Sequence, residues 1–153
     1  MRLMNVVRPE RTGGEIADWV GLVSAVLAMP RDGMLLFRGP AARLAARVCR
    51  ASALTLGSAV LFSSSGWREV DRRSDEGLVL LAHELVHVRQ YRERGFLRFL
   101  WEYGSEYLAG RFKGRSHLQA YRGLSFEQEA RRGEEVARRL LRSNGLLRGG
   151  SIL

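Results

Sequence analysis

Apolar residues recur at helical spacing in five stretches of this chain, and each stretch predicts an α-helix. The five ranges are 15–29, 41–50, 75–93, 96–107 and 125–143. Glycine, proline or asparagine stands at most of their ends, as expected where helices begin and stop. The pattern therefore predicts a helix-rich domain.

Two stretches predict β-strands instead. Residues 34–37 are short and apolar and predict one strand. Residues 53–63 read ALTLGSAVLFS, so β-branched and aromatic positions surround a central Gly-Ser, which predicts a strand or a tight hairpin of two strands. The serine-rich segment 63–66 predicts a loop. The expected fold class is α+β, with a small sheet or hairpin before the helix at 75–93.

The length of 153 residues fits one domain with a sizeable core. We expect this domain to span residues 14–147, between a flexible arm at 1–13 and a tail at 148–153. No signal peptide is recognisable at the N-terminus. The longest apolar stretch, residues 16–29, contains an aspartate and is shorter than the about 20 residues that cross a bilayer. We therefore expect no transmembrane segment and a cytoplasmic location.

The charge balance is strongly basic, with 25 Lys and Arg against 16 Asp and Glu and a formal net charge of +9. All the basic residues except Lys113 are arginines. This charge permits binding to nucleic acid or to an acidic membrane surface. The arginines alternate with glutamates along the predicted helices, which is typical of a solvated face, so nucleic-acid binding is not our expectation. The single cysteine, Cys49, excludes an intramolecular disulfide and a multi-thiolate zinc site.

The most specific chemistry lies in the H-E-x-x-H motif formed by His83, Glu84 and His87. On a helix, positions i and i+4 share one face, so the two imidazoles converge on one metal ion. Glu84 then lies near the open coordination position, where it can take a proton from water. An apolar run precedes the motif and predicts a largely buried helix. The alternative is a pair of core histidines without a metal.

A catalytic zinc takes three protein ligands, so one more must come from elsewhere in the chain. Gln90 and Glu93 exclude the form with a third histidine, which needs glycine and histidine at those two positions. A carboxylate from the helix at 125–143 is the other solution, and Glu127 and Glu129 are both candidates. Ser125 stands three residues before Gln128, the spacing of a helix-capping box.

The motifs resemble those of gluzincin-type zinc peptidases, whose third ligand is a glutamate on a downstream helix. In the CAAX-processing and heat-shock membrane peptidases of that group, the glutamate precedes an alanine by three residues, as E-x-x-A-D. The same spacing to Ala130 implies that Glu127 is the ligand, although Arg131 replaces the usual aspartate. Residues 53–135 also look like small bacterial domains of unknown function that carry H-E-L-x-H-V-x-Q before an aromatic helix.

The resemblance implies a Zn²⁺-dependent peptidase that cuts peptides or proteins. Glu84 would act as general base, and the strand at 53–63 could hold a peptide by β-augmentation. The reaction also needs a second electrophile for the developing oxyanion. The candidates are His117, Tyr103, Tyr107 and Tyr121, and we predict His117.

Two other classes of function remain. One is a non-enzymatic zinc-binding scaffold or interaction module that keeps the zincin core, and the other is an arginine-rich binder of nucleic acid or anionic surfaces. Glu84 favours the enzyme, because a purely structural zinc site does not need it and usually has four protein ligands. The aromatic stripe from Phe96 to Tyr107 could also bind a protein partner or pair two subunits.

Overall fold

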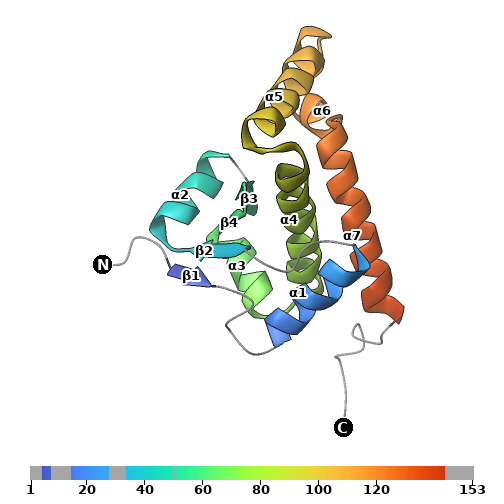
Figure 1. Ribbon diagram of the computed structural model, residues 1–153. Coiled ribbons are helices and arrows are strands. Elements are labelled where there is room, and N and C mark those ends of the chain that lie inside the picture. The colour runs from blue at the N-terminus through green and yellow to red at the C-terminus, as the bar shows by residue number, and fades with distance from the viewer. Residues whose placement is uncertain (1–4, 8–14, 28–33, 50, 144–153) are drawn as a thin grey trace.

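The computed structural model describes residues 5–7, 15–27, 34–49 and 51–143 and forms a helix-rich α+β domain in that part of the chain (Figure 1). The helices are α1 (Glu15–Val26), α2 (Pro40–Val48), α3 (Ser64–Asp71), α4 (Asp75–Arg94), α5 (Phe96–Phe112), α6 (His117–Arg122) and α7 (Ser125–Ser143). The strands are β1 (Asn5–Val7), β2 (Leu35–Arg38), β3 (Ala53–Leu56) and β4 (Ala59–Phe62). The predicted fold class is confirmed.

The four strands form one mixed sheet in the order β1-β2-β4-β3. Strand β2 pairs antiparallel with β1 and parallel with β4, whereas β3 and β4 form an antiparallel hairpin. Gly57, at the hairpin turn, has a φ of 63°, a left-handed conformation that glycine adopts without strain. A hairpin was one of the two alternatives predicted for residues 53–63, and it places β3 at one edge of the sheet.

Helix α4 lies at the centre of the domain, between the sheet and α7 (Figure 1). Its start is fixed by Ser74, whose hydroxyl accepts a hydrogen bond from the backbone N–H of Gly77 at 3.1 Å. Its end is fixed by Gly95, which has a φ of 80°. Apolar side chains of α1, the sheet, α4 and α7 form the main core. The predicted motif helix is confirmed at both ends.

Helices α4 and α7 approach each other closely, and this contact brings the site together. Gly133 of α7 faces α4, and a Cβ at that position would lie 2.7 Å from Cγ2 of Val86. That distance is shorter than any real contact of this kind, so the close approach depends on glycine. The helices therefore pack with their backbones near enough for a side chain of α7 to reach the histidines of α4.

Parts of the sequence-based prediction differ from the structure. The segment predicted as a loop at 63–66 instead begins α3, and the short helix α6 was not predicted. The capping box occurs at Ser116 and Gln119 at the start of α6. At Ser125 the hydroxyl instead donates to Glu106 at 2.6 Å, so the capping box predicted there is wrong.

The predicted arm and tail are only partly covered by the described residues. Strand β1 lies within the predicted arm and pairs with β2, while the rest of residues 1–13 and the tail at 148–153 lie outside the described residues. Within the described ranges, no helix combines the length and the apolar character needed to cross a bilayer.

Candidate metal centre

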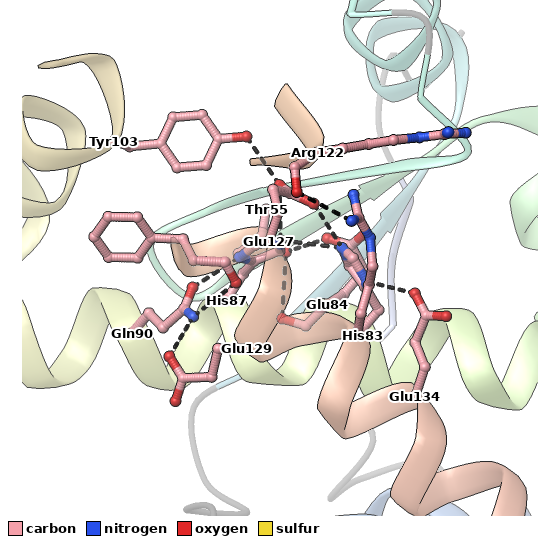
Figure 2. A network of polar contacts seen from close by, with 12 residues as sticks. Thr55, His83, Glu84, His87, Gln90, Tyr103, Arg122, Glu127, Glu129 and Glu134 are labelled. Carbon is pink, nitrogen blue, oxygen red and sulfur yellow. Dashed lines mark hydrogen bonds and ion pairs between the residues drawn. The ribbon is translucent and has the colours of Figure 1, made fainter. Parts of the chain in front are cut away.

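Three side chains from α4 and α7 converge on one point (Figure 2). His83 and His87 lie one helical turn apart on α4, and their Nε2 atoms are 3.1 Å from each other. Glu127, in the first turn of α7, places one carboxylate oxygen 3.5 Å from His83 Nε2 and the other 3.4 Å from His87 Nε2. The structure therefore brings together the three residues predicted as metal ligands.

The other nitrogen of each imidazole contacts an oxygen acceptor, which sets the tautomer of both rings. His83 Nδ1 lies 2.7 Å from a carboxylate oxygen of Glu134, and His87 Nδ1 lies 2.8 Å from the amide oxygen of Gln90. The amide nitrogen of Gln90 donates to the Phe126 carbonyl and to Glu129, so its amide oxygen faces His87. Each Nδ1 therefore carries a hydrogen, and each Nε2 is left to bind a cation.

The geometry of the three donors fits a tetrahedral metal ion. Ligand atoms about 2.0–2.1 Å from such an ion lie about 3.3 Å apart. The two Nε2 atoms are 3.1 Å apart, and each lies 3.4 or 3.5 Å from a different carboxylate oxygen of Glu127. Glu127 is only 2% exposed. One of its oxygens, Oε2, is buried without a hydrogen-bond donor. A buried carboxylate oxygen without a donor requires a compensating cation, so His83, His87 and Glu127 can hold a metal ion.

Two of these groups, His83 and Glu127, have shifted pKa values. Burial by itself disfavours the charged form of His83, but the adjacent carboxylates of Glu127 and Glu134 outweigh it and raise the pKa of His83 to about 10. Burial likewise disfavours ionised Glu127, but the two histidines hold the pKa of this carboxyl well below its usual range. In the metal-free protein a proton on His83 therefore takes the place of the cation.

We expect metal binding to release this proton. An imidazolium cannot bind a metal, so below pH 10 the ion must displace the proton of His83, and the apparent affinity should rise about tenfold per pH unit between about pH 6 and 8. Calorimetric titration in buffers of different ionisation enthalpy measures the number of protons released. His83→Gln should reduce this number by about one, whereas His117→Gln should not. A wild-type titration at pH 7 that releases no proton contradicts this assignment.

Glu84 is buried next to the metal ligands, at 4% exposure. Thr55 of β3 donates a hydrogen bond of 2.6 Å from its hydroxyl to Oε2 of Glu84. The negative charge of Glu84 also contributes to the raised pKa of His83, so the carboxylate faces the same space as the imidazoles. Thr55 was not among the site residues predicted from the sequence. The signal that could have found it is a polar residue at an inward position of an otherwise apolar hairpin.

Two tyrosines surround the carboxylate of Glu127. The hydroxyl of Tyr103, on α5, donates to Oε1 of Glu127 at 2.9 Å. Burial, followed by the charge of Glu127, raises the pKa of both Tyr103 and Tyr121 above the ordinary tyrosine value. The charge of Glu84 also acts on Tyr121, which places that side chain near both carboxylates. Both phenols therefore stay protonated and can donate hydrogen bonds.

The structure does not bring the other predicted residues into this cluster. His117 is exposed at the start of α6, where its Nδ1 lies 2.8 Å from the hydroxyl of Tyr107. Glu129, the alternative third ligand, pairs with Arg89 and accepts a hydrogen bond from Gln90. Glu129 therefore supports the residue that orients His87 and does not itself face the Nε2 atoms.

Comparison with known families matches residues 32–95 to the eCIS core domain, where eCIS stands for extracellular contractile injection system. The match covers less than half of the chain and runs from β2 to the end of α4, so it includes both histidines and Glu84 but not Glu127. No curated protein and no solved structure matches the chain. The protein thus combines an eCIS core match with a possible metal-binding triad whose third member lies outside the matched region.

Proposed function

We propose that this protein is a zinc-dependent peptidase of the gluzincin type. His83, His87 and Glu127 would hold the ion, and Glu84 would act as general base. The observation that carries the proposal is the buried Glu84, which is next to the metal ligands but bound to none of them in the described contacts. A site built only to hold a metal would not need a second buried carboxylate at this position.

The donor set favours zinc with a catalytic rather than a structural role. Two imidazoles and one carboxylate are a common catalytic set, whereas structural zinc sites usually have four protein ligands and are rich in cysteine. When bound, zinc supplies a Lewis acid and lowers the pKa of water toward about 7. The protein's own contribution is to orient both Nε2 atoms toward the ion, through the acceptors bound at each Nδ1, and to keep Glu127 ionised.

Glu84 is positioned to move a proton. Thr55 binds one of its carboxylate oxygens, which leaves the other oxygen able to accept a proton from water and later to pass it to the leaving amine. Tyr121, whose raised pKa keeps it protonated near both Glu84 and Glu127, is a better donor to the developing oxyanion than the exposed His117. We therefore replace His117 by Tyr121 in this role.

A peptide substrate could bind along β3. This strand pairs with β4 on one side, and on its other side no strand of the described sheet follows. An extended peptide can pair with such an edge through main-chain hydrogen bonds. Because Thr55 of β3 contacts Glu84, a peptide bound there would pass directly beside the general base.

The test is hydrolysis of a broad peptide library by the zinc-loaded protein. We expect cleavage that stops when a chelator removes the ion and returns when one equivalent of zinc is added. Stoichiometric zinc without any cleavage would support the alternative, a zinc-binding scaffold. Failure to bind zinc at all would contradict both the peptidase and the scaffold.

A further inference from the structure

Helix α5 has a continuous apolar stripe that faces solvent. Leu97, Trp101, Leu108 and Phe112 are 79%, 77%, 54% and 87% exposed. At 100° per residue these four positions fall within an arc of about 60°, and they extend about 22 Å along the helix. Gly104 lies on the same line and has nothing within 4 Å of where a Cβ would be. We call these residues the α5 stripe.

The opposite face of α5 packs against the rest of the domain. Phe99 packs against Tyr91 and Phe126, and Tyr103 donates to Glu127. Figure 1 shows α5 and α6 extending beyond the rest of the domain. The α5 stripe lies outside the core clusters, and an exposed apolar surface of this length often marks an interaction site.

The far end of α5 is strongly basic. Arg111, Lys113, Arg115 and Arg122 gather there, and the sequence has no Asp or Glu between Glu106 and Glu127. Within the described residues, none of these four side chains forms an ion pair with a carboxylate.

The basic end also contains a hollow of about 450 Å³. Three of the four cations line it, together with Gln119 and two glycines. Its lining has donors and positive charge but no carboxylate, so it fits an anionic group. Phe112 is the neighbour of Lys113 in the chain, and it brings the apolar stripe up to the edge of this basic end.

We propose that the α5 stripe and the basic end together dock on an anionic lipid membrane surface. A helix with Trp, Phe and Leu on one face and cations at its border can lie in the interface of a bilayer. Its apolar side chains enter the acyl boundary while its cations contact acidic headgroups. This proposal does not rest on the proposed peptidase activity.

Other occupants explain these observations less well. A second copy of this chain also carries a formal charge of +9, so the basic ends of two copies would repel each other. A nucleic acid would neutralise the basic end but would leave most of the apolar stripe in water. An anionic membrane can bury the apolar α5 stripe and neutralise the basic end at the same time.

Vesicle flotation of the full chain tests the proposal. We expect binding to vesicles of phosphatidylcholine with about one-third phosphatidylserine and little binding to phosphatidylcholine alone. Two double variants test the apolar stripe and the basic end separately. Leu108→Ser/Phe112→Ser should weaken binding about tenfold or more, and Lys113→Gln/Arg115→Gln about 30-fold, since each cation contributes about 1 kcal/mol.

Matched controls separate docking from non-specific effects. Leu44→Ser removes an exposed leucine on α2, and Arg138→Gln/Arg139→Gln removes two exposed cations on α7. We expect both controls to bind like the wild type and all variants to keep their circular dichroism spectra. The emission of Trp101 should shift to the blue on binding, and Trp101→Phe should lose that shift.

Three outcomes would overturn the proposal. One is the absence of binding to anionic vesicles, together with a dimer that Leu108→Ser/Phe112→Ser dissolves, which would make the stripe an interface between two copies. Another is an equal loss in the Arg138→Gln/Arg139→Gln control, which would show attraction by net charge alone. The third is binding to nucleic acid but not to vesicles.

Discussion

Replacing Glu127 with glutamine should weaken zinc binding more than 100-fold. The carboxylate is 2% exposed and lies between both imidazole Nε2 atoms, with one oxygen that has no hydrogen-bond donor. Glutamine keeps the shape but replaces a charged ligand with a neutral amide, which binds zinc poorly. Losing a partner behind a ligand costs about 10–100-fold in metal affinity, so losing the ligand itself should cost more. Competition with a chromophoric chelator at fixed pH measures the affinity.

Two matched variants rank the carboxylates around the site. Glu134→Gln removes the partner of His83 Nδ1, and we expect a loss of about 10–100-fold. Glu129→Gln acts only through Gln90 and Arg89, and we expect a loss below about tenfold. The expected order of effect is Glu127, then Glu134, then Glu129. If Glu129→Gln instead gives the largest loss in a protein that remains folded, Glu127 is not the third ligand.

The helix that carries the motif could be predicted because its signals are local. Ser74 and Gly95 cap its ends, and both residues can be recognised without any knowledge of the fold. The spacing of His83 and His87 also predicts their convergence from helical geometry alone. The α4–α7 contact is not local, since Gly133 is needed only because Val86 lies opposite. Resemblance therefore favoured Glu127 over Glu129, and only the packing of α7 on α4 shows that Glu127 faces the two Nε2 atoms.

The elements that were missed depend on contacts between distant parts of the chain. The segment at 63–66 contains three serines and a glycine, which locally favour a loop. In the structure Ser63 caps α3 by accepting a hydrogen bond from Gly66 at 3.0 Å. Glycine is required at position 66, because a Cβ there would lie 2.2 Å from the Ser52 carbonyl oxygen. Gly66, which locally favours a loop, is therefore needed for the close packing of α3 against Ser52.

The two S-x-x-Q sequences show the same limit for helix caps. Ser116 and Gln119 form a complete capping box, but Ser125 and Gln128 do not. Glu106 of α5 accepts hydrogen bonds from both the hydroxyl and the backbone N–H of Ser125. A tertiary contact therefore replaces the local cap. The partner Glu134 was hidden for a similar reason, since its role depends on where the Nδ1 atom of His83 points.

Replacing Glu84 with glutamine should lower the rate of peptide hydrolysis by about 10²–10⁴-fold, the usual contribution of a general base. Glutamine keeps the size of the side chain and can still accept the hydrogen bond from Thr55, but it cannot take a proton. Because Glu84 is not among the three metal ligands, the variant should still bind one equivalent of zinc. Rates measured on the zinc-loaded proteins with a cleaved library peptide separate these two effects.

Glu93→Gln is the matched control for Glu84→Gln. Glu93 is an exposed carboxylate on the same helix, so the variant makes the same change in charge away from the site, and we expect an unchanged rate. Thr55→Ala should give an intermediate rate, because Glu84 keeps its proton-accepting oxygen but loses the donor that orients it. If Glu84→Gln cleaves as fast as the wild type, the carboxylate is not the base. The zinc site would then belong to a scaffold, with Glu84 serving mainly to raise the pKa of His83 and to anchor β3 on α4.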